Sequence, residues 1–98
     1  MNSQKKDGQA EPIYVVSGGK GLAGNNMVHS LLIQYPNNNV PVIIVPQITE
    51  EKQLVKLVAK VKLEGGLITH TMVNRHLRDF LSNLCEENGV KHIDFMGN

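Results

Sequence analysis

Short apolar runs alternate along the chain with longer segments whose apolar residues recur at helical spacing. Residues 13–16 are a β-branched and aromatic run after Pro12, with the length and composition of a buried strand. Residues 40–46 are apolar without alternation, which favours a strand covered on both faces within a parallel sheet. Residues 67–70 and 90–95 are two further short apolar runs. The pattern therefore predicts four strands.

The segments between these strands predict three helices. The first spans about residues 22–35, and the second lies between Thr49 and Gly65. The third begins near Thr71 and ends at the left-handed stop offered by Gly89. Thr49 and Thr71 are the predicted N-caps, because a threonine hydroxyl accepts a hydrogen bond from the first turn. The positions expected on the buried helix faces are Met27, Val28, Leu31, Leu32, Tyr35, Leu54, Val55, Val58, Val61, Leu63, Val73, Leu77, Phe80, Leu81 and Leu84.

The alternation of strands and helices predicts an α/β fold. Short connections imply right-handed crossovers and a small doubly wound parallel sheet, about four strands with helices on both faces. We expect the strand order 2-1-3-4, because a doubly wound sheet places its first and third strands centrally. Residues 1–12 are predicted to be a disordered polar leader, and residues 13–98 a single domain. We expect this domain to be the N-terminal part of a longer protein.

Composition and charge exclude several classes of protein function. The chain has 98 residues, 41% of them hydrophobic, and ten basic against nine acidic side chains give a net charge of +1. No run of like charge exceeds two residues, so no electrostatic footprint for nucleic acid or membrane is present. The single Cys85, predicted to pack in the core, excludes an internal disulfide and favours a reducing compartment. We expect a cytoplasmic protein without nucleic-acid or membrane partners.

A glycine-rich turn joins the first strand to the first helix. Residues 19–24 satisfy the pattern G-x-G-x-x-G between a predicted strand and a predicted helix. Glycines let the main chain approach a ligand, and unpaired amides at a helix N-terminus attract an anion. The sequence predicts a phosphate-binding turn, to which Lys20 adds a positive charge, formed by Ser17, Gly18, Gly19, Lys20 and Gly21.

Two other interpretations of this turn stay open. The glycines can serve only a tight strand-to-helix turn, or the turn can belong to a dinucleotide-binding domain. The dinucleotide fingerprint requires an acidic residue about 20 positions later, where this chain has Val45-Pro46-Gln47. The pattern G-x-x-x-x-G-K-[ST] does not occur, so the sequence encodes no Walker-type site.

Polar residues at the other strand ends are candidates for supporting the site. Thr71 closes the third strand and Asp94 the fourth, on the same predicted edge as the glycine turn. Each also has a structural interpretation, Thr71 as a helix cap and Asp94 as a turn former. Arg75 and Arg78 are one turn apart and are expected on a solvated face.

No metal site is predicted. The four histidines share no ligand spacing, and one cysteine cannot build a zinc set. These histidines are His29, His70, His76 and His92.

Three stretches resemble a bacterial and plant regulatory family. They are Ile13-Tyr14-Val15-Val16-Ser17 followed by Gly19 and Gly21, Thr71-Met72-Val73 before Arg78, and Asp94-Phe95-Met96-Gly97. The family is the bifunctional serine/threonine kinase and phosphorylase that controls pyruvate, phosphate dikinase and phosphoenolpyruvate synthase. The resemblance spans nearly all of residues 13–97 and implies the same order of elements.

The resemblance also implies an activity and partners. Such proteins phosphorylate a threonine of the target dikinase or synthase with ADP, and remove that phosphate with inorganic phosphate to yield pyrophosphate. The nucleotide P-loop of the family lies in a C-terminal domain that this sequence does not contain. We therefore expect no cofactor in this chain and no kinase activity of the chain alone, although ADP and phosphate are implied for the family.

The glycine turn departs from the family pattern. The first motif of the family looks like Ser-Asp-Gly-Thr-Gly-x-Thr-Ala-Glu, and the matching positions are residues 17–25. The acidic and hydroxyl residues of this pattern are absent, because the matching positions hold Gly18, Lys20, Ala23 and Asn25, and Lys20 adds a cation. Thr71, Asp94 and Gly97 keep the residue type of the family and are carried over.

Three function hypotheses remain. The first is a divergent regulatory domain that binds a phosphate-bearing small molecule or partner at the turn, with Thr71 and Asp94 nearby. The second is a non-catalytic interaction module whose turn is structural. The third is a small dinucleotide-binding domain.

Overall fold

The computed structural model describes residues 10–96. Most of the predicted leader, residues 1–9, and the family glycine Gly97 lie outside the described residues. Seven elements alternate along the chain: β1 (Ile13–Val16), α1 (Leu22–Leu32), β2 (Val42–Val45), α2 (Glu51–Glu64), β3 (Leu67–His70), α3 (Arg75–Asn88) and β4 (His92–Asp94). The predicted order of strands and helices is confirmed, and the first and third strands have the predicted bounds.

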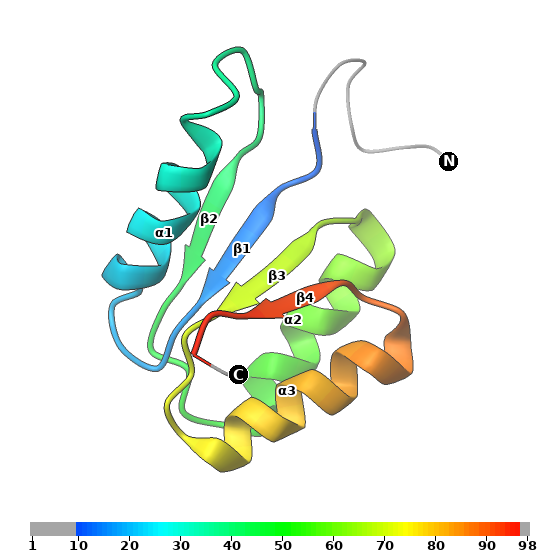
Figure 1. The fold of residues 1–98 in the computed structure, drawn as a ribbon. Helices are drawn as coiled ribbons and strands as arrows, with labels where there is room; N and C mark the ends of the chain where they lie inside the picture. Colours follow the sequence, from blue (N-terminus) through cyan, green and yellow to red (C-terminus); the bar gives the residue numbers. More distant parts are fainter. Residues whose placement is uncertain (1–9, 97–98) are drawn as a thin grey trace.

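The four strands form one parallel sheet in the order β2-β1-β3-β4 (Figure 1). In register, Val16 at the end of β1 lies beside Val45 of β2 and His70 of β3, and His70 lies beside Asp94 of β4. The predicted fold class and strand order are therefore confirmed. All four carboxyl ends lie along one edge of the sheet, so the connections that leave β1, β2 and β3 begin close together.

The helices divide between the two faces of the sheet because the chain reverses direction across it. The chain moves across the sheet in one direction from β1 to β2, and in the opposite direction from β2 to β3 and on to β4. Right-handed crossovers therefore place α1 on one face of the sheet and α2 and α3 on the opposite face (Figure 1). Gly24 of α1 lies against Val15, where an added Cβ would come within 2.7 Å of the valine Cγ1. Glycine is needed there for helix and sheet to approach.

The hydrophobic core lies between the sheet and the pair α2 and α3. Alternate strand residues such as Tyr14 and Ile68 point into it, together with the apolar stripes of both helices. Its buried members are Tyr14, Val16, Ile48, Leu54, Leu57, Val58, Val61, Ile68, Met72, Leu77, Leu81, Cys85 and Val90. Burial raises the pKa of the Cys85 thiol to about 11, so this cysteine is a packing residue without thiolate character at neutral pH.

The first helix is shorter and less buried than its apolar spacing predicts. α1 ends at Leu32 and not at residue 35, and Val28 is its buried apolar residue. Met27 and Leu31, expected inside, are 42% and 53% exposed, and Tyr35 is 65% exposed. Strand β2 is also not covered on both faces, because Ile43 is 39% exposed.

Two predicted helix starts and three further predicted core positions, outside α1, are wrong. Glu50, not Thr49, caps α2 through a reciprocal pair with Gln53, and Asn74, not Thr71, caps α3 by accepting from the Leu77 N–H at 3.0 Å. Both helices therefore begin later than predicted. Besides the residues of α1 and Tyr35, the exposed residues that the sequence placed in the core are Val55, Leu63 and Val73.

We predict that Gly21→Ala destabilises the fold and that Gly19→Ala does not. Gly21 has φ +83°, and an added Cβ would lie 2.7 Å from the Ile44 Cγ2, whereas a Cβ on Gly19 meets nothing closer than 3.9 Å. Strain of this kind costs about 1–3 kcal/mol, against less than about 0.5 kcal/mol for an unstrained surface change. Urea unfolding of both variants measures the difference, and equal losses would contradict the structure.

Candidate functional site at the glycine turn

The loop that leaves β2 braces the glycine turn. The Ser17 N–H donates to the Val45 carbonyl at 3.1 Å, which continues the pairing of β1 with β2 beyond the strands. The Gln47 N–H then donates to the Gly19 carbonyl at 2.9 Å, and the Ile48 N–H to the Ser17 carbonyl at 3.0 Å. These bonds occupy carbonyl groups of the turn and hold its backbone in one position.

The amides of the turn are used differently from its carbonyls. The Gly19 N–H donates to the Ser17 Oγ at 3.0 Å and is therefore occupied. Within residues 10–96, no acceptor is within hydrogen-bonding distance of the N–H groups of Gly18, Lys20 or Gly21. Three main-chain donors of the turn are left for a ligand or for solvent.

The N-terminus of α1 adds further donors beside the turn. The first intrahelical bond runs from the Asn25 N–H to the Gly21 carbonyl at 3.0 Å, and no side chain caps the preceding amides. The first turn of α1 also carries no acidic residue, so the positive end of the helix dipole has no counter-charge there. An anion at this position would meet main-chain donors and a favourable dipole together.

The sterics of the turn separate structural glycines from the others. Gly21 is required by its positive φ and by its contact with Ile44, whereas Gly18 and Gly19 have no positive φ. A Cβ on Gly18 would meet the Ile48 carbonyl at 3.5 Å, an ordinary contact. A tight turn accounts for Gly21 alone, and the fold itself does not require Gly18 or Gly19 to lack a side chain.

Lys20 is exposed in the middle of the turn. Within the described part of the chain its ammonium group forms no ion pair. Its charge is available to an anionic group that approaches the turn.

Of the two supporting residues, only Thr71 lies at the turn. The Thr71 N–H donates to the Val16 carbonyl at 3.1 Å, one residue before Ser17. A Cβ on Gly24 would lie 3.4 Å from the Thr71 Cγ2 and 3.9 Å from its Oγ1, so the Thr71 side chain lies against the first turn of α1. The cap of α3 is Asn74, and Thr71 lies at the end of β3 beside the start of the glycine turn.

Asp94 belongs to a different cluster. In register it stands two strands from Val16, about 10 Å away at ordinary strand spacing. Its Oδ2 lies 3.8 Å from the Arg78 Nε on α3, and its Oδ1 accepts from the Met96 N–H at 2.8 Å. The structure thus places the Asp94 carboxylate on the face of α2 and α3, away from Thr71. Arg78, expected on a solvated face, is 24% exposed beside this carboxylate.

His70 is the buried polar residue of this second cluster. Its side chain is fully buried, and neither ring nitrogen has a hydrogen-bond partner. The Nδ1 lies 3.9 Å from the Asp94 Oδ1, too far for a hydrogen bond. Burial lowers the pKa of His70; Asp94 opposes this shift, and His92 and Arg78 add to it. This shift favours the neutral form of the ring.

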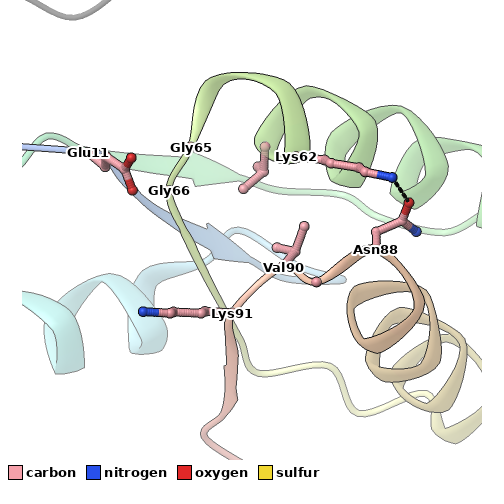
Figure 2. A pocket seen from close by; sticks show the side chains of 9 residues that line it. Glu11, Lys62, Gly65, Gly66, Asn88, Val90 and Lys91 are labelled. Carbon is pink, nitrogen blue, oxygen red and sulfur yellow. Dashed lines mark hydrogen bonds between the residues drawn. The ribbon is translucent and has the colours of Figure 1, made fainter.

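A hollow at the opposite edge of the sheet is not part of this site. It has a volume of about 230 Å³ and lies where α2 and α3 end, before β1 begins (Figure 2). Lys62 points across it and donates to the Asn88 Oδ1 at 3.2 Å. In open parallel sheets ligands bind at the carboxyl edge, whereas this hollow lies at the amino edge.

Residues 10–96 contain neither a candidate metal site nor a helix that could span a membrane. No group of three or more His, Cys, Asp or Glu side chains is arranged to hold a metal ion in that part of the chain. None of its helices has the length and apolar character required to span a bilayer.

The comparison with known proteins identifies the family. The family model described as kinase/pyrophosphorylase matches residues 13–98, which is most of the chain. The chain belongs to the kinase/pyrophosphorylase family. It is similar to proteins named as pyruvate, phosphate dikinase regulatory proteins in Chloroflexus aurantiacus, at 35% identity over 97 residues, and in Desulfotalea psychrophila, at 36% over 97 residues. The resemblance inferred from the sequence is confirmed.

The match covers almost all of this chain but a smaller share of its relatives. It includes 99% of the chain and 35% and 34% of those two relatives. A relative from Ligilactobacillus salivarius with the same name is 30% identical over 82 residues, or 84% of the chain and 30% of the relative. The chain therefore spans about a third of the length of the curated relatives it matches.

Gln47 and Gln53, which hold the loop beside the glycine turn, were not identified from the sequence. Gln47 is a non-glycine residue with φ 60°, and its carbonyl accepts from the Gln53 Nε2 at 3.2 Å. The Gln53 Oε1 accepts in turn from the Thr49 and Glu50 N–H groups, at 2.8 and 3.0 Å. The spacing of Glu50 and Gln53, three residues apart as in a capping box, was the signal in the sequence that could have indicated this arrangement.

We predict that His70 makes stability depend on pH. Its pKa is lower in the folded state than its ordinary value of 6.5, so the folded protein binds this proton more weakly than the unfolded chain. The contribution of His70 to the free energy of unfolding has its full value above pH 6.5. It decreases as the pH falls below 6.5, by at most about 1.4 kcal/mol per pH unit. Unfolding free energies of the wild type and His70→Leu between pH 5 and pH 7.5 test this. The variant should lose less stability on acidification, and parallel losses would contradict the assignment.

Proposed function

We propose that this chain is a regulatory or binding domain of the kinase/pyrophosphorylase family whose glycine turn binds a phosphate-bearing group. The phosphate would contact Ser17, Gly18, Gly19, Lys20 and Gly21, with Thr71 beside them. The observation that carries the proposal is the set of unpaired amides of Gly18, Lys20 and Gly21 at the uncapped N-terminus of α1. Amides held rigidly in this way bind an anion without first breaking protein hydrogen bonds.

The residues that depart from the family pattern favour an anion over a cation. A carboxylate at position 18 would compete for the unpaired amides, but Gly18 leaves them open. A neutral side chain at position 20 would add no charge, but Lys20 is an exposed cation. Asp94 is excluded from the proposed contacts because its carboxylate is paired with Arg78 on the other face.

The regulatory part of the proposal rests on the relatives. They are named as regulatory proteins of pyruvate, phosphate dikinase, so a dikinase, or the related phosphoenolpyruvate synthase, is the proposed target. The phosphoryl chemistry implied by the family, with ADP and inorganic phosphate, is assigned to a C-terminal P-loop domain outside the matched third. Our proposal for this chain is binding without turnover, in the cytoplasm.

A non-catalytic interaction module is the second candidate. It is favoured by the exposure of apolar side chains along α1, among them Met27 and Leu31. The dinucleotide alternative has less support, because Gln47 stands where a ribose-binding carboxylate is needed and its backbone is committed to the turn.

We predict that phosphate and pyrophosphate stabilise the wild-type chain and that Lys20→Ala weakens this effect. An anion at ten times its Kd adds about 1.4 kcal/mol, which raises the Tm of a domain of this size by about 5–10 °C. Thermal unfolding with phosphate, pyrophosphate, ADP and NAD measures the effect. Lys56→Ala, which removes an exposed lysine from the middle of α2, is the matched control and should respond like the wild type.

Each outcome of that screen selects one hypothesis. Stabilisation by phosphate and pyrophosphate that depends on Lys20 supports the anion-binding turn. No stabilisation by any of the four ligands favours the interaction module. A larger effect of NAD than of phosphate favours the dinucleotide domain.

We predict that Gly18→Asp abolishes stabilisation by phosphate even though Lys20 is retained. The added carboxylate lies beside the unpaired amides of Lys20 and Gly21 and repels a second anion. Gly18→Asn has the same shape without the charge and should keep part of the phosphate effect. Isothermal titration of both variants with pyrophosphate tests this, and equal affinities of the two would argue against binding at the turn.

A further inference from the structure

One continuous part of the chain carries no formal charge. Residues 21–49 contain no Asp, Glu, Lys or Arg, and they form α1, the loop after it, and β2. By contrast, the 14 residues of α2 include six charged side chains. A helix that faces water on its outer side normally carries charge there, so the outer face of α1 is unusual for a solvent-exposed surface.

Several large apolar side chains of this uncharged segment are exposed. Among them, Met27 is 42% exposed, Leu31 53%, Ile33 79% and Tyr35 65%. These residues lie along α1 and the turn that follows it. We call this strip, together with Phe95, the α1 surface.

Two hollows flank α1. One, of about 390 Å³, lies between α1 and the segment after β4, and its apolar lining is Met27, Leu31 and Phe95. The other, of about 400 Å³, lies between the end of α1 and the start of β2, and includes Leu32, Ile33 and Val40. No Asp, Glu, Lys or Arg lines either hollow. Apolar side chains of a second polypeptide can enter both.

The sheet is open on the same side. Ile93 of β4 is in register with Thr69 of β3, which is in register with Val15, and Val15 contacts α1. Ile93 therefore points to the face of α1, and it is 45% exposed. Figure 1 shows α1 over the β1 and β2 side of this face, and no helix of the described residues lies over β4 there. Thr69 of β3 is buried on this face, so the open part is the β4 edge.

We propose that the α1 surface is the docking face for the part of the family polypeptide that lies outside the matched third. The relatives from Chloroflexus and Desulfotalea are almost three times as long as the matched region, since it covers 35% and 34% of them. Depletion of charge and enrichment in Met, Tyr and Phe are typical of the core of a protein interface, and here Met27 and Tyr35 are exposed and Phe95 is half-buried. This inference rests on family membership and does not depend on the phosphate-binding turn.

The topology explains why the covering polypeptide must come from elsewhere in such a protein. A strand added next to β4 by a right-handed crossover would bring its helix to the face of α2 and α3. Crossovers that add strands beyond β4 therefore do not cover the open β4 edge on the α1 face. That edge needs a segment that returns to this face after the sheet has been extended.

The test joins the whole 98-residue chain to the rest of the Chloroflexus relative, in place of the segment of that relative that it matches. Hydrogen exchange of the α1 amides is compared between this chimera and the chain alone. We expect exchange in α1 to be about tenfold slower or more in the chimera. Leu31→Glu should remove this protection, whereas Leu63→Glu, at an 85% exposed position of α2, should keep it.

Three results would overturn the proposal. The first is equal exchange of the α1 amides in the chimera and in the chain alone. The second is protection in the chimera that Leu31→Glu leaves intact. The third is a chain that dimerises alone through a contact sensitive to Leu31→Glu, which would assign the α1 surface to a second copy. Because Leu31 is 53% exposed, Leu31→Glu should fold, and the melting curve of the isolated variant checks this.

Discussion

The structure depends on the parallel pairing of β1 with both of its neighbours. Val16 is in register with Val45 on one side and His70 on the other, so three chain segments leave the sheet at the same level. Two backbone bonds continue that pairing beyond the strands, from the Ser17 N–H to Val45 and from the Thr71 N–H to Val16. The glycine turn is rigid because it is bonded to the loop after β2, and Thr71 lies beside it for the same reason. A shift of one residue in either register would separate these groups.

The turn combines a structural requirement with an available binding surface. The carbonyls of Ser17, Gly19 and Gly21 and the Gly19 amide are engaged, while three other amides are not. Only Gly21 is fixed by backbone conformation and packing, so the two glycines before it are free to serve close approach of a ligand. The substitutions that distinguish this chain from the family pattern add a cation and remove an anion at the same place. They change which charge the turn can accept without changing the fold that presents it.

The fold could be predicted from the sequence further than the site could. Apolar runs and glycine stops are local signals, and they were sufficient for β1, β3, the end of α3 at Gly89 and the strand order. The cap of α2 was misassigned because Thr49 and Glu50 are adjacent acceptors, and only the contact with Gln53 selects between them. The apolar spacing of α1 predicted burial, but its outer residues stay exposed because nothing in residues 10–96 covers them. Asp94 was placed on the correct edge of the sheet, but its face follows from the register with His70, and its contact with Arg78 joins residues from two different elements.

The most direct test of the central claim is the response of individual backbone amides to pyrophosphate, followed by 15N–1H correlation spectra. We predict that the resonances of Gly18, Lys20 and Gly21 shift on titration, because their N–H groups are unpaired. The amides of Gly19 and Gln47, which already donate to Ser17 and Gly19, should shift much less. Shifts spread evenly over the lysines of α2, with none centred on the turn, would contradict the account.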